Sequence, residues 1–326
     1  MDRRSFLLYS LSTSTLFAYN PDIKIQKWTL GKYGDFHFKQ MNKNLFVMHG
    51  VKQNPNEENM GFIHNVVLIE SKNGLIVIDP GGYNIGLHVE QQISNISKKP
   101  IIAIFNTHDH DDHWFANSVL KEKYPNAKIY AHKLMKSAAI ELYGGDYESY
   151  GFSFKKAKNI SFPEIVLDNG DKVTIDGEEF YIQHPKNAHT NNDITITHKN
   201  TNTIIMGDLL FEQTLANFGL NSSISGNIAF LDKIDKQHEY KLYIPGHGYS
   251  GNKETCFEPY YKFMSIIRDE VINAHKADIS FASLHVAKEK ILERLAFEDN
   301  LNFSHAFIDR YVSNIYNELD EEYSFT

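Results

Sequence analysis

Cysteine is almost absent from this chain of 326 residues, which contains only Cys256. A single cysteine excludes an internal disulfide framework and any cysteine-rich metal site. A metal bound within the chain must therefore take its ligands from histidine and carboxylate side chains. Because Cys256 lies outside every motif described below, we expect it to pack in the protein interior.

Long apolar runs and clusters of basic residues are also missing. No segment of about 18 apolar residues is present, although a membrane-spanning helix needs that length. The formal net charge is −8, and no run of basic residues is longer than two. Nucleic acid is bound through concentrated positive charge, so we do not expect it as a partner. With 42% hydrophobic and 23% charged residues, the composition indicates an ordinary globular protein.

The first twenty residues have the layout of an export signal. A basic start precedes a modestly apolar stretch that ends in a small residue, Ala18. The run Arg-Arg-Ser-Phe-Leu at residues 3–7 resembles the twin-arginine signal of proteins that are exported after folding. We therefore predict an export signal over residues 1–20 and a periplasmic or otherwise exported protein. The alternative is an ordinary amphipathic N-terminal segment on a cytoplasmic protein.

Short apolar runs alternate with helical patterns over residues 40–250, which predicts one layered α/β domain. Expected strands cover residues 44–50, 65–71, 74–82, 99–108 and 127–132, and expected helices lie near 83–97, 115–124 and 133–143. Asn-Gly at 169–170 and Asp-Gly at 176–177 predict two hairpin turns, and residues 193–210 read as a further hairpin. No internal repeat and no low-complexity linker interrupts this pattern.

Beyond residue 250 the strand patterns stop and helical spacing takes over. We expect helices over residues 257–276, 284–297 and 303–319. These segments predict a helical C-terminal extension, residues 251–326, that packs on the main domain.

The strand over residues 99–108 runs into the sequence THDHDDHWFAN at residues 107–117. His108 and His110 are two positions apart, so in extended backbone both side chains point to the same side and reach one ion. Asp112 and His113 follow where the chain turns into a helix, and their side chains point elsewhere. This division suits two metal ions a few ångströms apart. We expect Asp111 to face solvent or to bond backbone locally.

Other candidate ligands also follow apolar strands. His189 lies in a loop after a strand, Asp208 ends a strand, and His247 stands between two glycines after another. Asp79, in VIDPGG, is placed to accept a hydrogen bond from the second nitrogen of a ligand histidine. The plain alternative is that histidine-rich loops are surface and strand-end aspartates form turns. We read three histidines without motifs as structural or surface residues: His64, His132 and His184.

The motifs H-x-H-x-D-H, A-H-T, G-D and P-G-H-G follow in this order after D-P-G-G. Over residues 40–250 they resemble the metallo-β-lactamase superfamily. The resemblance implies a four-layered αβ/βα sandwich with a dinuclear zinc site at one edge. It implies His108, His110 and His189 on the first zinc ion, Asp112, His113 and His247 on the second, and Asp208 bridging the two.

Such a site predicts a zinc-dependent hydrolase. Two zinc ions that share a water lower its pKa towards about 7, so that a bridging hydroxide forms at neutral pH. We expect this hydroxide to attack a small-molecule ester, thioester, lactone, lactam or similar bond, with Asp112 and Asp208 as the catalytic residues that orient it. The aspartate of the G-D motif resembles the bridging residue of the thioester, lactone and phosphodiester hydrolases more than that of the β-lactamases.

Two other functions fit the same ligands. The first is a mononuclear iron enzyme similar to the persulfide dioxygenases, which use this fold for sulfur oxidation. The second is a metal-binding accessory protein without turnover. The export signal, the helical tail and the ending YVSNIYNELDEEY resemble a periplasmic branch, the quinoprotein relay system zinc metallohydrolases. The oligomeric state stays open.

Trp114 and Phe115 are the clearest departure from the family pattern, because many relatives have small residues after the D-H step. We expect these two side chains at the entrance of the site, where they would decide substrate access.

Overall fold

The structure, a computed structural model, describes residues 36–56, 58–144, 160–219, 221–237, 239–296 and 307–324. The predicted export signal over residues 1–20 lies outside the described residues. Among the described residues, no helix combines the length and the apolar character needed to cross a membrane.

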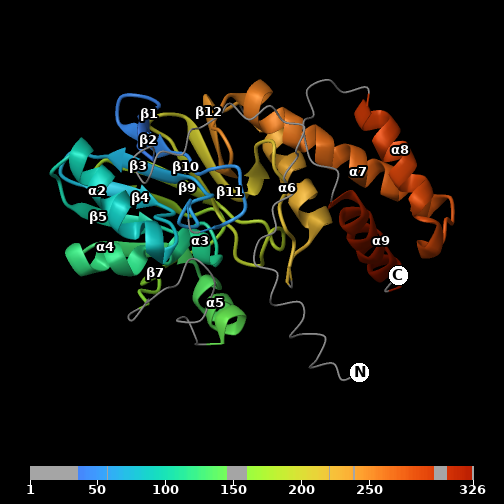
Figure 1. Cartoon of the computed structure of the whole chain (residues 1–326), viewed down its shortest axis with the longest axis horizontal. Coiled ribbons are helices and arrows are strands. Elements are labelled where there is room, and N and C mark those ends of the chain that lie inside the picture. The colour runs from blue at the N-terminus through green and yellow to red at the C-terminus, as the bar shows by residue number, and fades with distance from the viewer. Residues whose placement is uncertain are drawn as a thin grey trace.

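Two sheets form the centre of the molecule (Figure 1). The first runs in the order β1 (Lys39–Gln40), β2 (Leu45–Met48), β3 (Val66–Glu70), β4 (Leu75–Ile78), β5 (Ile101–Phe105), β6 (Lys128–His132) and β7 (Ile165–Leu167). Its strands pair antiparallel from β1 to β4 and parallel from β4 to β7. The second runs in the order β12 (Leu242–His247), β11 (Thr203–Phe211), β10 (Thr195–His198), β9 (Glu178–Gln183) and β8 (Lys172–Ile175). Only its β11–β12 pair is parallel.

Helices cover the outer face of each sheet (Figure 1). On the first sheet lie α2 (Gly86–Ile96), α3 (Asp111–Trp114), α4 (Asn117–Lys123) and α5 (Met135–Tyr143), with a 3₁₀ turn at Tyr83–Ile85. On the second lie α6 (Ile224–Asp235) and α7 (Glu258–Lys276), and α8 (His285–Ala296) and α9 (Ile308–Ser324) pack against these helices. Short turns lie at Lys253–Phe257 and Phe281–Ser283. The layers follow the order helix, sheet, sheet, helix, which confirms the predicted fold class and its C-terminal helices.

The apolar runs in the sequence reflect burial on both faces of the sheets. In β3, Val67 packs between the sheets, whereas Val66 and Leu68 pack under the helices of the first sheet. Strands buried on both sides read as unbroken apolar runs, as seen in IIAIF and LIVI. The loops that follow such strands are therefore held on rigid supports.

The C-terminal helices share one apolar core with the second sheet. Met206 and Phe211 of β11, Phe263 of α7, Ile291 of α8 and Tyr311 of α9 belong to the same buried cluster. This extension therefore shares its core with the sheet that carries three of the seven candidate ligands.

One predicted hairpin and one helix differ between the prediction and the structure. The Asn169-Gly170 step does not close a hairpin, because β7 pairs with β6 in the first sheet while β8 pairs with β9 in the second. Gly170 has a positive φ of 92°, a conformation that serves a crossover between sheets as well as a hairpin. The helix expected near 115–124 is present as α4, with the short helix α3 before it. The helix α6 was not predicted, because Gly226 and Asn227 weaken its helical signal.

Candidate metal centre

The first sheet supplies four of the predicted ligands from one short segment. β5 ends at Phe105, and the loop after it carries His108 and His110. His110 has extended backbone angles and precedes α3, whose first turn contains Asp112 and His113. The predicted change from extended chain to helix within the motif is confirmed.

The second sheet supplies three more residues from separate segments. His189 lies in the loop between β9 and β10, and His247 is the last residue of β12. Asp208 lies within β11, which continues to Phe211, so it does not end its strand as predicted. The pairing of β11 with β12 is irregular between Gly207 and Phe211, next to the Asp208 side chain.

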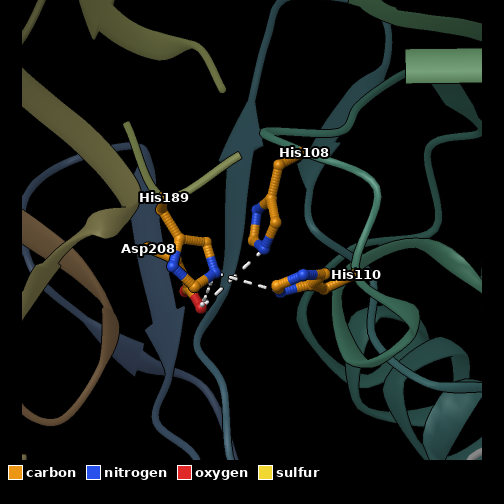
Figure 2. Close-up of side chains that lie close together, drawn as sticks. All are labelled: His108, His110, His189 and Asp208. Atoms are coloured by element: carbon orange, nitrogen blue, oxygen red, sulfur yellow. Dashed lines mark hydrogen bonds and ion pairs between the residues drawn. The ribbon is translucent and has the colours of Figure 1, made fainter. Parts of the chain in front are cut away.

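His108, His110, His189 and Asp208 form the first cluster, in which one potential ligand atom of each residue lies within 4.8 Å of the others. Figure 2 shows their side chains converging from both sheets. His110 Nδ1 and His189 Nε2 are 3.0 Å apart. Asp208 Oδ2 lies 3.3 Å from His189 Nε2 and 3.8 Å from His108 Nε2.

Asp112, His113 and His247 form the second cluster within the same distance limit. The Nε2 atoms of His113 and His247 are 3.4 Å apart, and Asp112 Oδ2 lies 3.7 and 3.6 Å from them. Asp208 Oδ1 lies 3.1 Å from His113 Nε2 and 3.3 Å from His247 Nε2. One carboxylate therefore presents one oxygen to each cluster.

The hydrogen bonds behind the second cluster direct its two Nε2 atoms into the cluster. His113 Nδ1 donates to Asp79 Oδ2 at 2.9 Å, and His247 Nδ1 donates to the carbonyl oxygen of Ile63 at 2.7 Å. The Nε2 atoms, 3.4 Å apart, are thus the ones placed to bind an ion. A metal ion bound there would displace the proton that the surrounding carboxylates favour on His113, so these residues fit a metal ion.

Burial and missing partners support the same fit. His108 Nε2 and Asp112 Oδ2 are buried and have no hydrogen-bond partner among the described residues. Burial lowers the pKa of His108 well below its usual value and that of His189 to about 3. Both imidazoles are thus neutral at pH 7, which is the form that binds metal ions. Nitrogen and carboxylate donors are the set that zinc takes when thiolates are absent.

The charges within the centre oppose the effect of burial. Burial lowers the pKa of His113, but the carboxylates of Asp208, Asp112 and Asp79 outweigh it and raise that pKa well above its usual value. Burial raises the pKa of Asp208, but His247, His113 and His108 outweigh it and hold that pKa well below its usual value. The centre therefore keeps negative charge available for a cation.

Asp79 anchors the first-sheet segment from behind. Its Oδ1 accepts from the backbone N–H of Thr107 at 2.8 Å, and its Oδ2 accepts from Thr107 Oγ1 at 2.7 Å and from His113. Asp79 has a φ of 51°, which aspartate tolerates better than most residues. On the other side, a Cβ atom at Gly246 would lie 2.0 Å from Asp208 Oδ1, so glycine is required there.

A second buried network holds the His189 loop, and we did not predict it. Both oxygens of Asp193 accept from Thr190, from its backbone N–H at 2.7 Å and its hydroxyl at 2.9 Å. The neighbouring Asn192 donates to Asp109 Oδ1 at 3.0 Å, which ties this loop to the His108–His110 segment. The run T-N-N-D is a turn signal, because an aspartate side chain that bonds a nearby backbone N–H stabilises such loops.

Trp114 and Phe115 do not lie at the entrance of the site, so that prediction is wrong. Both side chains are 0% exposed and pack with Met135 and Tyr143. Trp114 Nε1 donates to the carbonyl oxygen of Asp109 at 2.8 Å. The helical turn of α3 sends Asp112 and His113 into the centre and carries the next two side chains into the core beneath it.

The residues without motifs take structural positions. His64 is buried, with its ring centroid 5.1 Å from that of His113, and the rings of His132 and His184 stack at 3.8 Å. Cys256 is buried as predicted. Asp111 is half-buried and belongs to neither metal-ligand cluster.

The chain is similar in sequence to one protein superfamily and to several of its relatives. The sequence profile of the metallo-beta-lactamase superfamily matches residues 60–247. A probable metallo-hydrolase of Methanocaldococcus jannaschii is 26% identical over 197 residues, which cover 59% of this chain and 91% of the relative. Another, from Streptococcus pyogenes serotype M6, is 24% identical over 190 residues, which cover 56% and 78%.

Solved structures share the fold at low sequence identity. A metallo-beta-lactamase from Pontibacter korlensis is 14% identical with a TM-score of 0.53, covering 68% of this chain and 94% of that one. A stereoselective inverting sec-alkylsulfatase from Pseudomonas sp. is 15% identical with a TM-score of 0.65, covering 87% of this chain and 50% of that one. Since the superfamily profile also spans more than half of the chain and ends at His247, the chain belongs to the metallo-β-lactamase superfamily.

Proposed function

We propose that the chain, a metal-dependent hydrolase of the metallo-β-lactamase superfamily, holds two zinc ions and cleaves an ester-type bond in a small molecule. The observation that carries this proposal is the position of Asp208, whose two carboxylate oxygens face different clusters. A carboxylate shared in this way suits a pair of ions rather than one. His108, His110 and His189 would hold the first ion, and Asp112, His113 and His247 the second.

Two zinc ions held here would supply hydroxide at neutral pH and positive charge beside the substrate oxygen. The chain contributes the remaining parts of the reaction. Asp112 and Asp208 orient the attacking water and accept its hydrogen bonds, and Asp79 keeps His113 in the required tautomer. The side chains of Asp79, Asp112 and Asp208 are at most 4% exposed, which strengthens their electrostatic effect on the reacting bond.

The centre and the similar proteins both support the substrate class that we propose. We propose an ester, thioester, lactone or lactam, because each presents a polarisable carbonyl to the attacking water. The similar sec-alkylsulfatase acts on a sulfate ester, so that bond belongs in the same screen. Chromogenic members of these five classes and a phosphodiester, assayed side by side, would identify the bond.

Metal analysis combined with substitution tests the proposal. We expect about two zinc ions per purified chain, and loss of both zinc and hydrolysis in His108→Ala and Asp112→Ala. His285→Ala is the matched control, because His285 is an exposed histidine on α8. Retained turnover in the two site variants would contradict the proposal, and a single iron with oxygen uptake would favour the sulfur-oxidation alternative.

Export is a separate proposal that rests on residues 1–20. A reporter fused to residues 1–25 should leave the cytoplasm in a host with a working twin-arginine pathway. Replacing Arg3 and Arg4 by lysine should keep the reporter in the cytoplasm.

A further inference from the structure

The Phe211 side chain lies face to face with one of the candidate metal ligands. Its ring is stacked on that of His247, with the ring centroids 4.9 Å apart and the planes inclined by 9°. The Phe211 ring is also 6.2 Å from that of His189, a member of the first cluster, at an angle of 56°. Phe211 is 0% exposed. One buried aromatic ring therefore stacks on the second cluster and approaches the first at an angle.

An irregularity in the β11–β12 pair brings Phe211 to this position. Between Gly207 and Phe211, β11 advances by four residues, whereas its partner β12 advances by only two over the same stretch. Residues three apart on a regular strand, such as Asp208 and Phe211, point to opposite faces of the sheet. The extra residues remove this alternation, so that both side chains reach the same centre. The feature that places the Asp208 carboxylate between the clusters thus also places the Phe211 ring.

The His247 ring is held at its edge and on its face. Its Nδ1 donates to the carbonyl oxygen of Ile63 at 2.7 Å, and Phe211 covers one face. Its Nε2 is directed into the second cluster, 3.4 Å from Nε2 of His113. Tyr260 of α7 packs on Phe211 with the ring centroids 6.1 Å apart and is itself 0% exposed. Phe211 therefore cannot move away from His247 without disturbing the packed core.

The face of an aromatic ring attracts positive charge, because the quadrupole of the ring is negative above and below its plane. A neutral imidazole gains ordinary stacking energy from such a face. An imidazole that binds a zinc ion gives electron density to the metal and becomes more positive, so its attraction to the face increases. The increase is largest where water is excluded, as it is around Phe211. Stacking therefore favours the metal-bound form of His247 over its empty form.

We propose that Phe211 is a positioning residue that raises the zinc affinity of the second cluster by stacking on the metal-bound imidazole of His247. The inference rests on the proposed hydrolase function, because it requires the second zinc ion. It adds a residue that binds no ion itself but sets the zinc concentration at which the second site fills. A purely structural role for Phe211 would depend on the shape of its ring, whereas this role depends on the charge distribution of the ring.

Fluorinated phenylalanines separate charge distribution from shape, because fluorine withdraws electron density from the ring face and changes the ring size only slightly. Phe211 is replaced in turn by 4-fluoro-, 3,5-difluoro- and 3,4,5-trifluorophenylalanine. We expect the Kd of one zinc equivalent, that of the second cluster, to rise stepwise to about tenfold with three fluorines. The other equivalent should change by less than about twofold, because the His189 ring is farther away and inclined. Competition with a fluorescent zinc chelator, starting from metal-depleted full-length protein, measures both constants.

The same series at Phe257 is the matched control. Phe257 is 0% exposed, and its ring packs against those of Tyr243 and Tyr261. Fluorination there should leave both zinc constants unchanged. An equal loss of affinity in the Phe257 series, or a flat response to fluorine at Phe211, would overturn the inference. A flat response would do so even if Phe211→Leu binds zinc weakly, because leucine changes the shape as well as the charge distribution.

Cobalt provides a second readout that does not depend on turnover. The visible absorption bands of bound cobalt report the arrangement of ligands around the ion. With the trifluorinated ring at Phe211, the band positions at saturation should match the wild type, while more cobalt is needed to reach saturation. Shifted bands would show that the ligands had been displaced and would overturn the inference. A wild-type chain that binds no second zinc equivalent would contradict the proposed function itself, and this inference with it.

Discussion

Asp208 and Asp79 show how single carboxylates organise the centre. Asp208 lies between the two clusters, whereas Asp79 lies behind one of them and bonds both His113 and Thr107. Asp79 thus sets the ring orientation of His113 without being a candidate ligand itself. Residues in this position usually change metal affinity by about 10–100-fold when substituted.

Asp79→Asn should therefore weaken zinc binding to the second cluster by about tenfold or more. Asparagine keeps the size of the side chain and also tolerates the positive φ of this position, so the fold should persist. Competition with a fluorescent zinc chelator measures the effect. Asp168→Asn, at an exposed carboxylate paired with Lys133, is the control and should bind zinc like the wild type. Unchanged zinc affinity in Asp79→Asn would refute the orienting role.

Asp193 supports the first cluster, as Asp79 supports the second. Asp193→Ala removes both bonds to Thr190 and should loosen the loop that carries His189. We expect weaker binding of one zinc equivalent, with the second equivalent unaffected, in a titration of metal-depleted protein. Loss of both equivalents in parallel would point to general unfolding instead, which circular dichroism would detect.

At the scale of elements, the C-terminal helices support the loop beside His189. Tyr311 of α9 donates to the carbonyl oxygen of Ala216, and the Phe218 ring lies 5.5 Å from Tyr311 and 5.7 Å from His189. Glu318 of α9 accepts from the backbone N–H groups of Ile224 and Ser225, at the start of α6. The extension thus reaches the metal centre through one intervening loop.

Glu318→Gln should lower the free energy of unfolding by about 1 kcal/mol, because a carboxylate at a helix start is favoured by the helix dipole. Urea unfolding at low salt measures the change, which should shrink as salt is added. Glu293→Gln on α8 is the matched control, since Glu293 is exposed. An equal effect in both variants would show that overall charge, and not the contact with α6, is responsible.

At the scale of the whole molecule, the centre joins the two sheets. Its candidate ligands come from the loop after β5 and from α3 on one side, and from the β9–β10 loop, β11 and β12 on the other. Bound ions stabilise the folded chain in proportion to the logarithm of their free concentration over the Kd. Chelation of zinc should therefore lower Tm, with about 4 kcal/mol lost when zinc had been at about 1,000 times its Kd. His108→Ala should already have the lower Tm and respond little to chelator.

Acid should also weaken the fold through histidines away from the centre. Burial, followed by the neighbouring His184, lowers the pKa of His132 from 6.5 to about 4. The unfolded chain then binds a proton at higher pH than the folded chain, so stability falls as pH drops from about 6.5 to 4. His132→Asn should reduce the slope of the free energy of unfolding against pH, by an amount that corresponds to at most one proton. Urea unfolding between about pH 6.5 and 4, in the presence of a metal chelator, measures this slope. The same pH dependence in His132→Asn and the wild type would show that His132 does not cause this loss of stability.

The candidate ligands and the layered α/β class followed from the sequence because they depend on local order, whereas the four-layer order followed from the resemblance to the superfamily. Unbroken apolar strands, turn residues and the spacing of His108 and His110 act within a few residues, so they are visible in one segment. The same holds for the change to helix at Asp112, which separates the two ligand sets. The resemblance to the superfamily added the grouping of His189, Asp208 and His247 with them.

Tertiary structure alone decided the rest. Trp114 and Phe115 are buried because α3 packs against Met135 and Tyr143, which no local pattern reveals. The Asn169-Gly170 turn connects two sheets because strand pairing depends on distant partners. The neutralised Lys52 depends on Glu212, which lies 160 positions away in the sequence but forms an ion pair with it in space. Charge and burial are properties of neighbours in space, so the local sequence does not determine them.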